Sequence, residues 1–203
     1  MGALLQEHDV QMLILGAVIT LVSSITSLLI QNLIGLFLKS KGKVKIYVKT
    51  VYNKTTQKSW GFQNSINGMI FDIPLWIEIH NTKAKKEVVR DLSLNLYYQG
   101  QFVEKMIQVT HSMKGNEKIH YGNNGSYSFL LYENEITRYD LEFILSIKDC
   151  NQNFDTVKIS FYDTKDHNHE YDLFKISNSW EISNNEIDKD WRLINKNLFI
   201  NRV

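Results

Sequence analysis

The sequence is poor in the two residues that most constrain a backbone, with one proline and one cysteine among 203 residues. A lone Cys150 cannot form a disulfide within the chain, which suits a reducing compartment and argues against secretion. Few prolines together with ten tyrosines and ten phenylalanines favour β structure, because aromatic side chains fit a pleated, half-buried surface.

Charge is absent from Val10 to Leu38, a run of 29 residues. As a helix this run would measure about 43 Å, more than the ~30 Å hydrocarbon core of a bilayer. The preceding residues 1–9 contain no Lys or Arg, and the apolar run is too long for a cleaved signal peptide. We therefore expect a single membrane-spanning helix over 10–38, preceded by a short extracytoplasmic N-terminus.

Basic residues are missing before this helix and abundant after it, with seven lysines between positions 39 and 58. Because lysines flanking a spanning helix stay on the cytoplasmic side, the sequence predicts a single-pass protein of the cell membrane with its N-terminus outside and residues 39–203 in the cytoplasm. We expect the basic segment 39–58 to contact the bilayer through its first lysines, which are Lys39, Lys41, Lys43 and Lys45.

From residue 59 onward the chain has 16 basic and 20 acidic residues, a formal charge of −4. A nucleic-acid-binding domain normally has a basic face of its own. We therefore expect no nucleic acid among the partners. The bilayer and an unidentified protein or small-molecule ligand are the expected ones.

Small and polar residues recur along one face of the expected helix, at spacings of three and four; they are Gly16, Thr20, Ser23, Ser27 and Gln31. Small residues allow helices to approach closely in lipid, and hydroxyl groups can hydrogen-bond between helices. This pattern favours a homo-oligomer formed through the helix. Two alternatives remain open: hydrogen bonds from the hydroxyls back to their own helix, and a polar pore lining.

The domain expected over 59–182 consists of short segments in which apolar and polar residues alternate, the signature of half-buried strands. Including the first strand, in the basic segment, we expect strands at 43–52, 70–81, 88–98, 102–110, 126–131, 139–147, 157–162 and 171–176. The polar stretches 53–68 and 111–124 are expected to be loops, with a short strand possible around Ile119. This spacing predicts an antiparallel all-β domain and favours an immunoglobulin-like β-sandwich over a β-barrel.

The period changes at the C-terminus, where Ile187, Trp191, Ile194 and Leu198 follow at spacings of four, three and four. This pattern is typical of an amphipathic helix, which we expect over 183–203. Packing against the domain is the favoured role, and membrane contact or assembly are alternatives.

Sequence motifs for chemistry are scarce. The segment Asp163–Asp172 concentrates acids and histidines that could in principle bind a metal, but the same residues are ordinary turn formers. No nucleophile elbow, fixed triad spacing or phosphate-binding glycine loop is present. We therefore expect no catalytic residue, no metal site and no cofactor, and a protein that is not an enzyme.

Two functional hypotheses follow. In the first, the anchored β domain is a protein-interaction or ligand-binding module. In the second, it is a sensor-effector whose β domain binds a ligand, such as a nucleotide signal, and drives oligomerisation of the helix and membrane disruption. This second layout resembles that of prokaryotic antiviral effectors in which a β-rich domain reads a cyclic nucleotide beneath membrane helices, although those usually have more than one helix.

Overall fold

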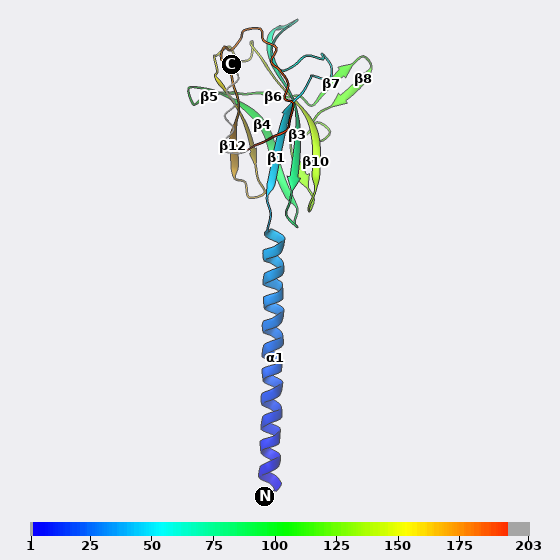
Figure 1. Cartoon of the computed structure of the whole chain (residues 1–203), viewed down its shortest axis with the longest axis vertical. Helices are drawn as coiled ribbons and strands as arrows, with labels where there is room; N and C mark the ends of the chain where they lie inside the picture. The colour runs from blue at the N-terminus through cyan, green and yellow to red at the C-terminus, as the bar shows by residue number, and fades with distance from the viewer. Residues whose placement is uncertain (1, 195–203) are drawn as a thin grey trace. The chain divides into compact units, whose positions relative to one another are not determined.

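The computed structural model describes residues 2–194, and the chain divides into two compact units between Lys41 and Gly42. The first unit is a helix and the second is a domain of antiparallel strands (Figure 1).

Helix α1 (Gly2–Ser40) begins earlier than the apolar run, because Ala, Leu, Gln and Glu near the N-terminus are good helix formers. Within it, Asp9–Lys39 spans 31 residues and contains an 18-residue window with a mean hydropathy of 2.4, so it is long and apolar enough to cross a membrane. Its apolar side chains are exposed, Leu13 by 76%, whereas the core helix of a soluble protein would bury them. An apolar helix that could anchor the chain is therefore present as expected.

The β domain contains two large sheets and a small hairpin, and all of their strand pairs are antiparallel. The first sheet has the order β13-β1-β3-β10-β6, with β2 also beside β3; its strands are β1 (Val44–Thr50), β2 (Gly61–Ser65), β3 (Gly68–Asn81), β6 (Ile107–Gln108), β10 (Ile136–Ser146) and β13 (Arg192–Leu193). The second has the order β12-β11-β4-β5, with β9 also beside β4; its strands are β4 (Glu87–Tyr98), β5 (Gln101–Lys105), β9 (Phe129–Leu131), β11 (Thr156–Tyr162) and β12 (Asn168–Lys175). The hairpin pairs β7 (His111–Lys114) with β8 (Glu117–His120).

Strand β3 is the centre of the first sheet, and its proline lies where its neighbour changes. Residues Gly68–Asp72 pair with β2, and Leu75–Asn81 pair with β1. Pro74 falls between these two ladders, and its carbonyl accepts a hydrogen bond from Val51 N. The N–H that proline lacks would point to this same side, so the pairing of Pro74 with Glu142 of β10 is maintained.

Both sheets contribute to a shared hydrophobic core. Leu75, Ile77 and Ile79 of β3 are fully buried, as the alternation predicts. On the second sheet Leu92, Leu94 and Leu96 are buried in the same cluster. The antiparallel all-β class is therefore confirmed, and the side chains at intervening positions of β3 form the sheet's outer face.

Several segments differ from expectation. The expected loop 53–68 contains β2, and its aromatic residues Trp60 and Phe62 are buried in the core. The expected strand 102–110 breaks at Met106: β5 pairs with β4, whereas β6 crosses to β10 in the other sheet. The turn at Gln99–Gly100 was expected, and both residues have positive φ, as a two-residue hairpin turn requires.

The C-terminal helix expected over 183–203 is not present in 183–194, and 195–203 lie outside the described residues. The backbone there is extended and finds its hydrogen bonds on other strands. Ser183 N donates to Phe62 O (3.1 Å), and Ile194 N donates to Ile46 O (2.8 Å) next to β13. Asp188 is buried and accepts from the Thr50 backbone N–H and hydroxyl. These tertiary partners outweigh a helical spacing that only three described residues support.

The topology gives the β domain two distinct ends. Since β1 and β10 run antiparallel to β3, and β11 antiparallel to β4, the start of β1 lies at the same end as three turns. We call this the proximal end, and it comprises residues 42–45, 82–86, 132–135 and 163–167. The opposite, distal end includes the turn 51–60 and the segment 106–127, which contains the β7–β8 hairpin (Figure 1).

Candidate functional site: an aromatic sheet face and a buried carboxyl pair

The outer face of the first sheet is open along the proximal half of β3 and rich in aromatic rings. Tyr47 of β1 and His80 of β3 contact each other with ring centroids 4.7 Å apart. The Arg138 guanidinium of β10 lies 4.6 Å from the Trp76 ring centroid, and Trp191 stacks on Trp76 at 6.4 Å. We call these five residues the aromatic face. The first four are brought together by the register of β1, β3 and β10.

Charges on and around the aromatic face are unevenly paired. Glu78 Oε1 lies 2.5 Å from His80 Nε2, and Asp140 Oδ2 lies 2.5 Å from Lys54 Nζ. The exposed cations Lys45 and Arg138 have no carboxylate partner among residues 9–194. The face therefore combines half-covered rings with a surplus of positive charge.

Toward the distal end the same outer face is covered, and two acids become buried beneath the cover. Asp72 and Glu142 are only 2% and 8% exposed. The Asn53 amide donates to both carboxylates, to Asp72 Oδ2 at 2.9 Å and to Glu142 Oε1 at 3.1 Å. The other oxygens, Asp72 Oδ1 and Glu142 Oε2, have no hydrogen-bond partner in the described part of the chain. No positive side chain therefore compensates this pair.

Burial changes the protonation of Asp72. Burial foremost, and then repulsion from Glu142, raises the pKa of Asp72 to about 7, against the opposing effect of the Asn53 hydrogen bond. Burial foremost, and then the nearby Glu142 carboxylate, raises the pKa of Tyr121 to about 12. The Asp72 carboxyl therefore exchanges its proton near neutral pH.

Two aromatic residues from the 106–127 segment and its junction with β9 form part of the cover. The Tyr127 hydroxyl lies 2.7 Å from Val109 O and 2.8 Å from Glu142 O. Tyr121 contacts the Ser112 hydroxyl at 3.1 Å, and Ser112 in turn contacts Thr55 of the 51–60 turn at 2.9 Å. The two distal segments thus hold each other over the carboxyl pair.

The acid- and histidine-rich segment Asp163–Asp172 forms a hairpin turn and the edge strand β12. Asp163 accepts from the backbone N–H groups of Lys165 and His167, and its other carboxylate oxygen lies 3.0 Å from His169 Nε2. Although burial opposes it, these hydrogen bonds lower the pKa of Asp163 to about 2. In residues 2–194 no group of three His, Cys, Asp or Glu side chains could hold a metal ion.

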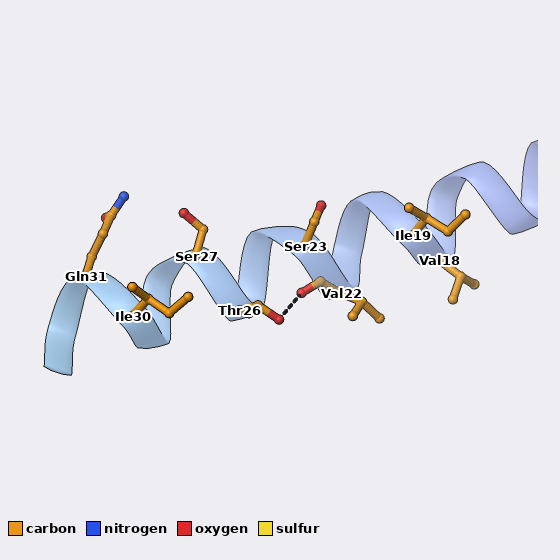
Figure 2. Close-up of a pocket in the computed structure, with 8 residues that line it drawn as sticks. All are labelled: Val18, Ile19, Val22, Ser23, Thr26, Ser27, Ile30 and Gln31. Atoms are coloured by element: carbon orange, nitrogen blue, oxygen red, sulfur yellow. Dashed lines mark hydrogen bonds between the residues drawn. The ribbon is translucent and has the colours of Figure 1, made fainter. Parts of the chain in front are cut away.

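The polar stripe expected on the helix lies on α1, where its hydroxyls divide into two groups. Thr20 Oγ1 donates to Gly16 O at 2.8 Å, and Ser23 Oγ donates to Thr20 O at 3.0 Å. Ser27 and Gln31 form no side-chain hydrogen bond within the described helix. Figure 2 shows Ser23, Ser27 and Gln31 pointing to the same side, while Thr26 bonds back to Val22 O at 2.8 Å. Within the described helix, the stripe's side chains are therefore hydrogen-bonded at Thr20 and Ser23 but not at Ser27 and Gln31.

The four lysines expected at the membrane surface are spread over three local structures. Lys39 is in the last turn of α1, Lys41 and Lys43 lie between α1 and β1, and Lys45 points outward from β1. Lys41 N bonds to Phe37 O and Leu38 O, both at 3.2 Å, which caps the helix C-terminus.

No protein-family model matches the chain, and a comparison with curated proteins finds no match either. Sequence reasoning found the strands that carry Tyr47, Trp76 and His80 but not the aromatic face, because pairing register is invisible in a single sequence. Trp191 was assigned to a helix, and Arg138 had no signal at all.

Proposed function

We propose that this protein is a single-pass membrane protein with its N-terminus outside and its β domain in the cytoplasm, where the domain acts as a binding module. The length and apolar composition of α1 support the anchor. The lysines that follow it, absent before it, support the orientation.

The observation that carries the binding role is the aromatic face. Trp, Tyr and Arg are the residues that dominate binding energy at protein interfaces, and here they converge from three strands and the residue before β13. Lys45 and Arg138 lack carboxylate partners within residues 9–194, so the chemistry that fits this face is an acidic protein surface. The partner we propose is therefore a protein with acidic side chains around an apolar centre.

A site-specific crosslinking experiment in cells tests this role. A photoreactive amino acid replacing Arg138 should yield one discrete adduct on illumination, because a neighbour would lie against it. The matched control places the same group at Lys118 in the exposed β7–β8 hairpin. Trp76→Ser should abolish the adduct at 138. The absence of a discrete adduct, or equal adducts at both positions, would contradict a partner on this face.

We also propose that the two sheets pack face to face as a sandwich of the immunoglobulin-like type. Each sheet is a separate hydrogen-bonded network, with β13 and β6 at the ends of one and β12 and β5 at the ends of the other. Their inward side chains share one core cluster. This arrangement supports a sandwich over a closed barrel, because a barrel has no edge strands.

A second candidate function is the sensor-effector, in which self-association of α1 perturbs the membrane. The specific observation is that Ser27 and Gln31 face the same side without a partner in the described helix (Figure 2). An amide unsatisfied within a bilayer is costly, and a second copy of the helix could supply its partner.

Paired substitutions separate this effector from a passive anchor. Ser27→Leu with Gln31→Leu should abolish energy transfer between labelled full-length chains in vesicles, together with any loss of membrane integrity on expression. Ser24→Leu with Thr26→Leu is the control, since these hydroxyls bond to their own helix at 2.8 Å. Equal self-association in both double variants would leave α1 as a passive anchor.

A further inference from the structure

The proximal end of the β domain gathers segments that are far apart in sequence. The Lys43 backbone accepts from Thr82 N at 3.0 Å, which joins the start of β1 to the 82–86 turn. Asn134 N donates to Lys83 O at 3.2 Å, which adds the 132–135 turn. Thr164 Oγ1 accepts from Val88 N at 2.9 Å, which adds the 163–167 turn. The proximal end is thus one connected surface.

Most acids of the proximal end are neutralised or hydrogen-bonded within it. Glu87, next to the 82–86 turn, lies 2.7 Å from Lys83 Nζ and 3.3 Å from Lys85 Nζ. Asp166 pairs with Arg90 at 2.7 Å. Asp163 is held by His169, and Glu135 accepts from the Thr137 hydroxyl at 2.8 Å. In the described chain only Glu133 of this end is left without a partner.

Most lysines of the proximal end, by contrast, have no carboxylate partner in the described part of the chain. Among residues 9–194 no carboxylate pairs with four exposed lysines of this end, which are Lys43, Lys45, Lys86 and Lys165. The four segments of the proximal end contain six lysines and four acids, so the surface has a formal excess of two positive charges, and its unpaired charges are mainly lysines.

Exposed apolar side chains accompany these lysines. Tyr132 is 54% exposed and Ile136, which follows the same turn, is 64% exposed. Lys86 Nζ lies 4.9 Å from the Tyr132 ring centroid, so the cation and the ring form one local group. Lysines next to a tyrosine and an aliphatic side chain are the combination that suits a lipid headgroup region.

We propose that the proximal end docks on an anionic bilayer surface. The proposal rests on the membrane anchoring proposed above, because Lys41 alone separates the last residue of α1 from Gly42. The occupant of this surface is a leaflet containing acidic lipids, with lysines against the headgroups and Tyr132 and Ile136 at the acyl boundary. Docking would fix the orientation of the domain and leave the aromatic face beside the membrane rather than on it.

Hydrogen exchange of the full-length chain in lipid nanodiscs tests this proposal. Nanodiscs of phosphatidylcholine are compared with nanodiscs containing phosphatidylglycerol at low salt. Peptides covering 82–86 and 132–135 should exchange several-fold more slowly in the anionic discs, and 0.5 M salt should remove the difference, since the Debye length then falls to a few ångströms. Peptides of the β7–β8 hairpin should exchange equally in both.

Variants complete the test. Lys86→Gln with Lys165→Gln should abolish the protection, whereas Lys114→Gln with Lys118→Gln in the distal hairpin should keep it. All four side chains are exposed, so folding is preserved. Equal exchange in the two lipids, or protection that survives Lys86→Gln with Lys165→Gln, would overturn the docking. A chain that fails to enter nanodiscs would instead overturn the anchor itself, so the two failures are distinguishable.

Discussion

The two ends of the β domain treat their buried acids in opposite ways. Beside the proximal turns, Glu87 is buried with two lysines and the Thr164 hydroxyl around it, and although burial opposes them these hydrogen bonds lower its pKa. Toward the distal end, Asp72 and Glu142 are buried with Asn53 between them and no cation against them, and the pKa of Asp72 is raised to about 7. Burial raises the pKa of both acids, and only around Glu87 do hydrogen bonds and lysine charge outweigh it.

This difference indicates which buried acids stabilise the folded domain and which destabilise it. The proximal acid stabilises the turns that form the proposed docking surface. The distal acids oppose the packing of the 51–60 turn and the 106–127 segment over the sheet, and Asn53 compensates for that opposition. The distal cover should therefore be the part of the domain that responds to pH and substitution.

Replacing Asn53 should have the largest effect on the free energy of unfolding. Asn53→Ala removes the donor to both carboxylates and the acceptor of the Thr55 and Thr56 backbone N–H groups. Leaving several buried polar groups unsatisfied should lower the free energy of unfolding by about 3 kcal/mol. Urea denaturation of the full chain in detergent, followed by tryptophan fluorescence, measures the change.

Two controls accompany this variant. Asn67→Ala, in the exposed β2–β3 turn, should change stability by less than about 0.5 kcal/mol. Adding Asp72→Asn to Asn53→Ala should restore more than Asp72→Asn gains by itself, because Asn53 and Asp72 share one interaction. Strict additivity of the two substitutions would show that Asn53 acts elsewhere.

Asp72→Asn by itself should have the opposite effect and raise the free energy of unfolding at pH 8. A raised pKa means that the folded state holds the proton more tightly, so stability falls as pH rises from about 4 to about 7 and then levels off. The shift corresponds to about 4 kcal/mol, and unsatisfied amide hydrogens of the new asparagine should offset about half. We expect a gain of about 2 kcal/mol at pH 8 and, because the amide penalty does not depend on pH, a loss of about 2 kcal/mol at pH 4, where Asp72 is already neutral.

Thermal unfolding at a series of pH values measures this prediction. The slope of stability against pH between 4 and 7 should flatten in Asp72→Asn. Asp149→Asn, an exposed acid in the turn after β10, is the matched control and should leave the slope unchanged. A wild-type protein that is as stable at pH 8 as at pH 4 would refute the uncompensated pair.

The long strands were predictable because their side chains alternate with period two over many residues. In β3, Leu75, Ile77 and Ile79 are all buried as that pattern requires. The same alternation places Asp72 on the polar side of the strand, yet it is buried, because the 51–60 turn and the 106–127 segment fold over it. Long-range cover of this kind leaves no local signal in the sequence.

Short elements were the least predictable. Strands β2 and β13 are too short to establish a period, and they form because neighbouring strands offer free backbone groups. The helical spacing of Ile187, Trp191 and Ile194 was therefore misleading, since Ile46 O and Thr50 provide strand-like partners instead. The aromatic face depends on the same register, so it too emerged only from the fold.

The smallest expected effect concerns Glu87 at the compensated end. Glu87→Gln keeps the shape and the hydrogen bond to Thr164 but removes the charge, and its lysine partners are exposed enough to be hydrated instead. We expect a loss of about 1 kcal/mol at pH 7. Because the pKa of Glu87 is lowered, its contribution is present above about pH 4.5 and is lost as pH falls, so variant and wild type should converge near pH 3. A loss that persists at pH 3 would mean that packing, rather than charge, holds the proximal turns together.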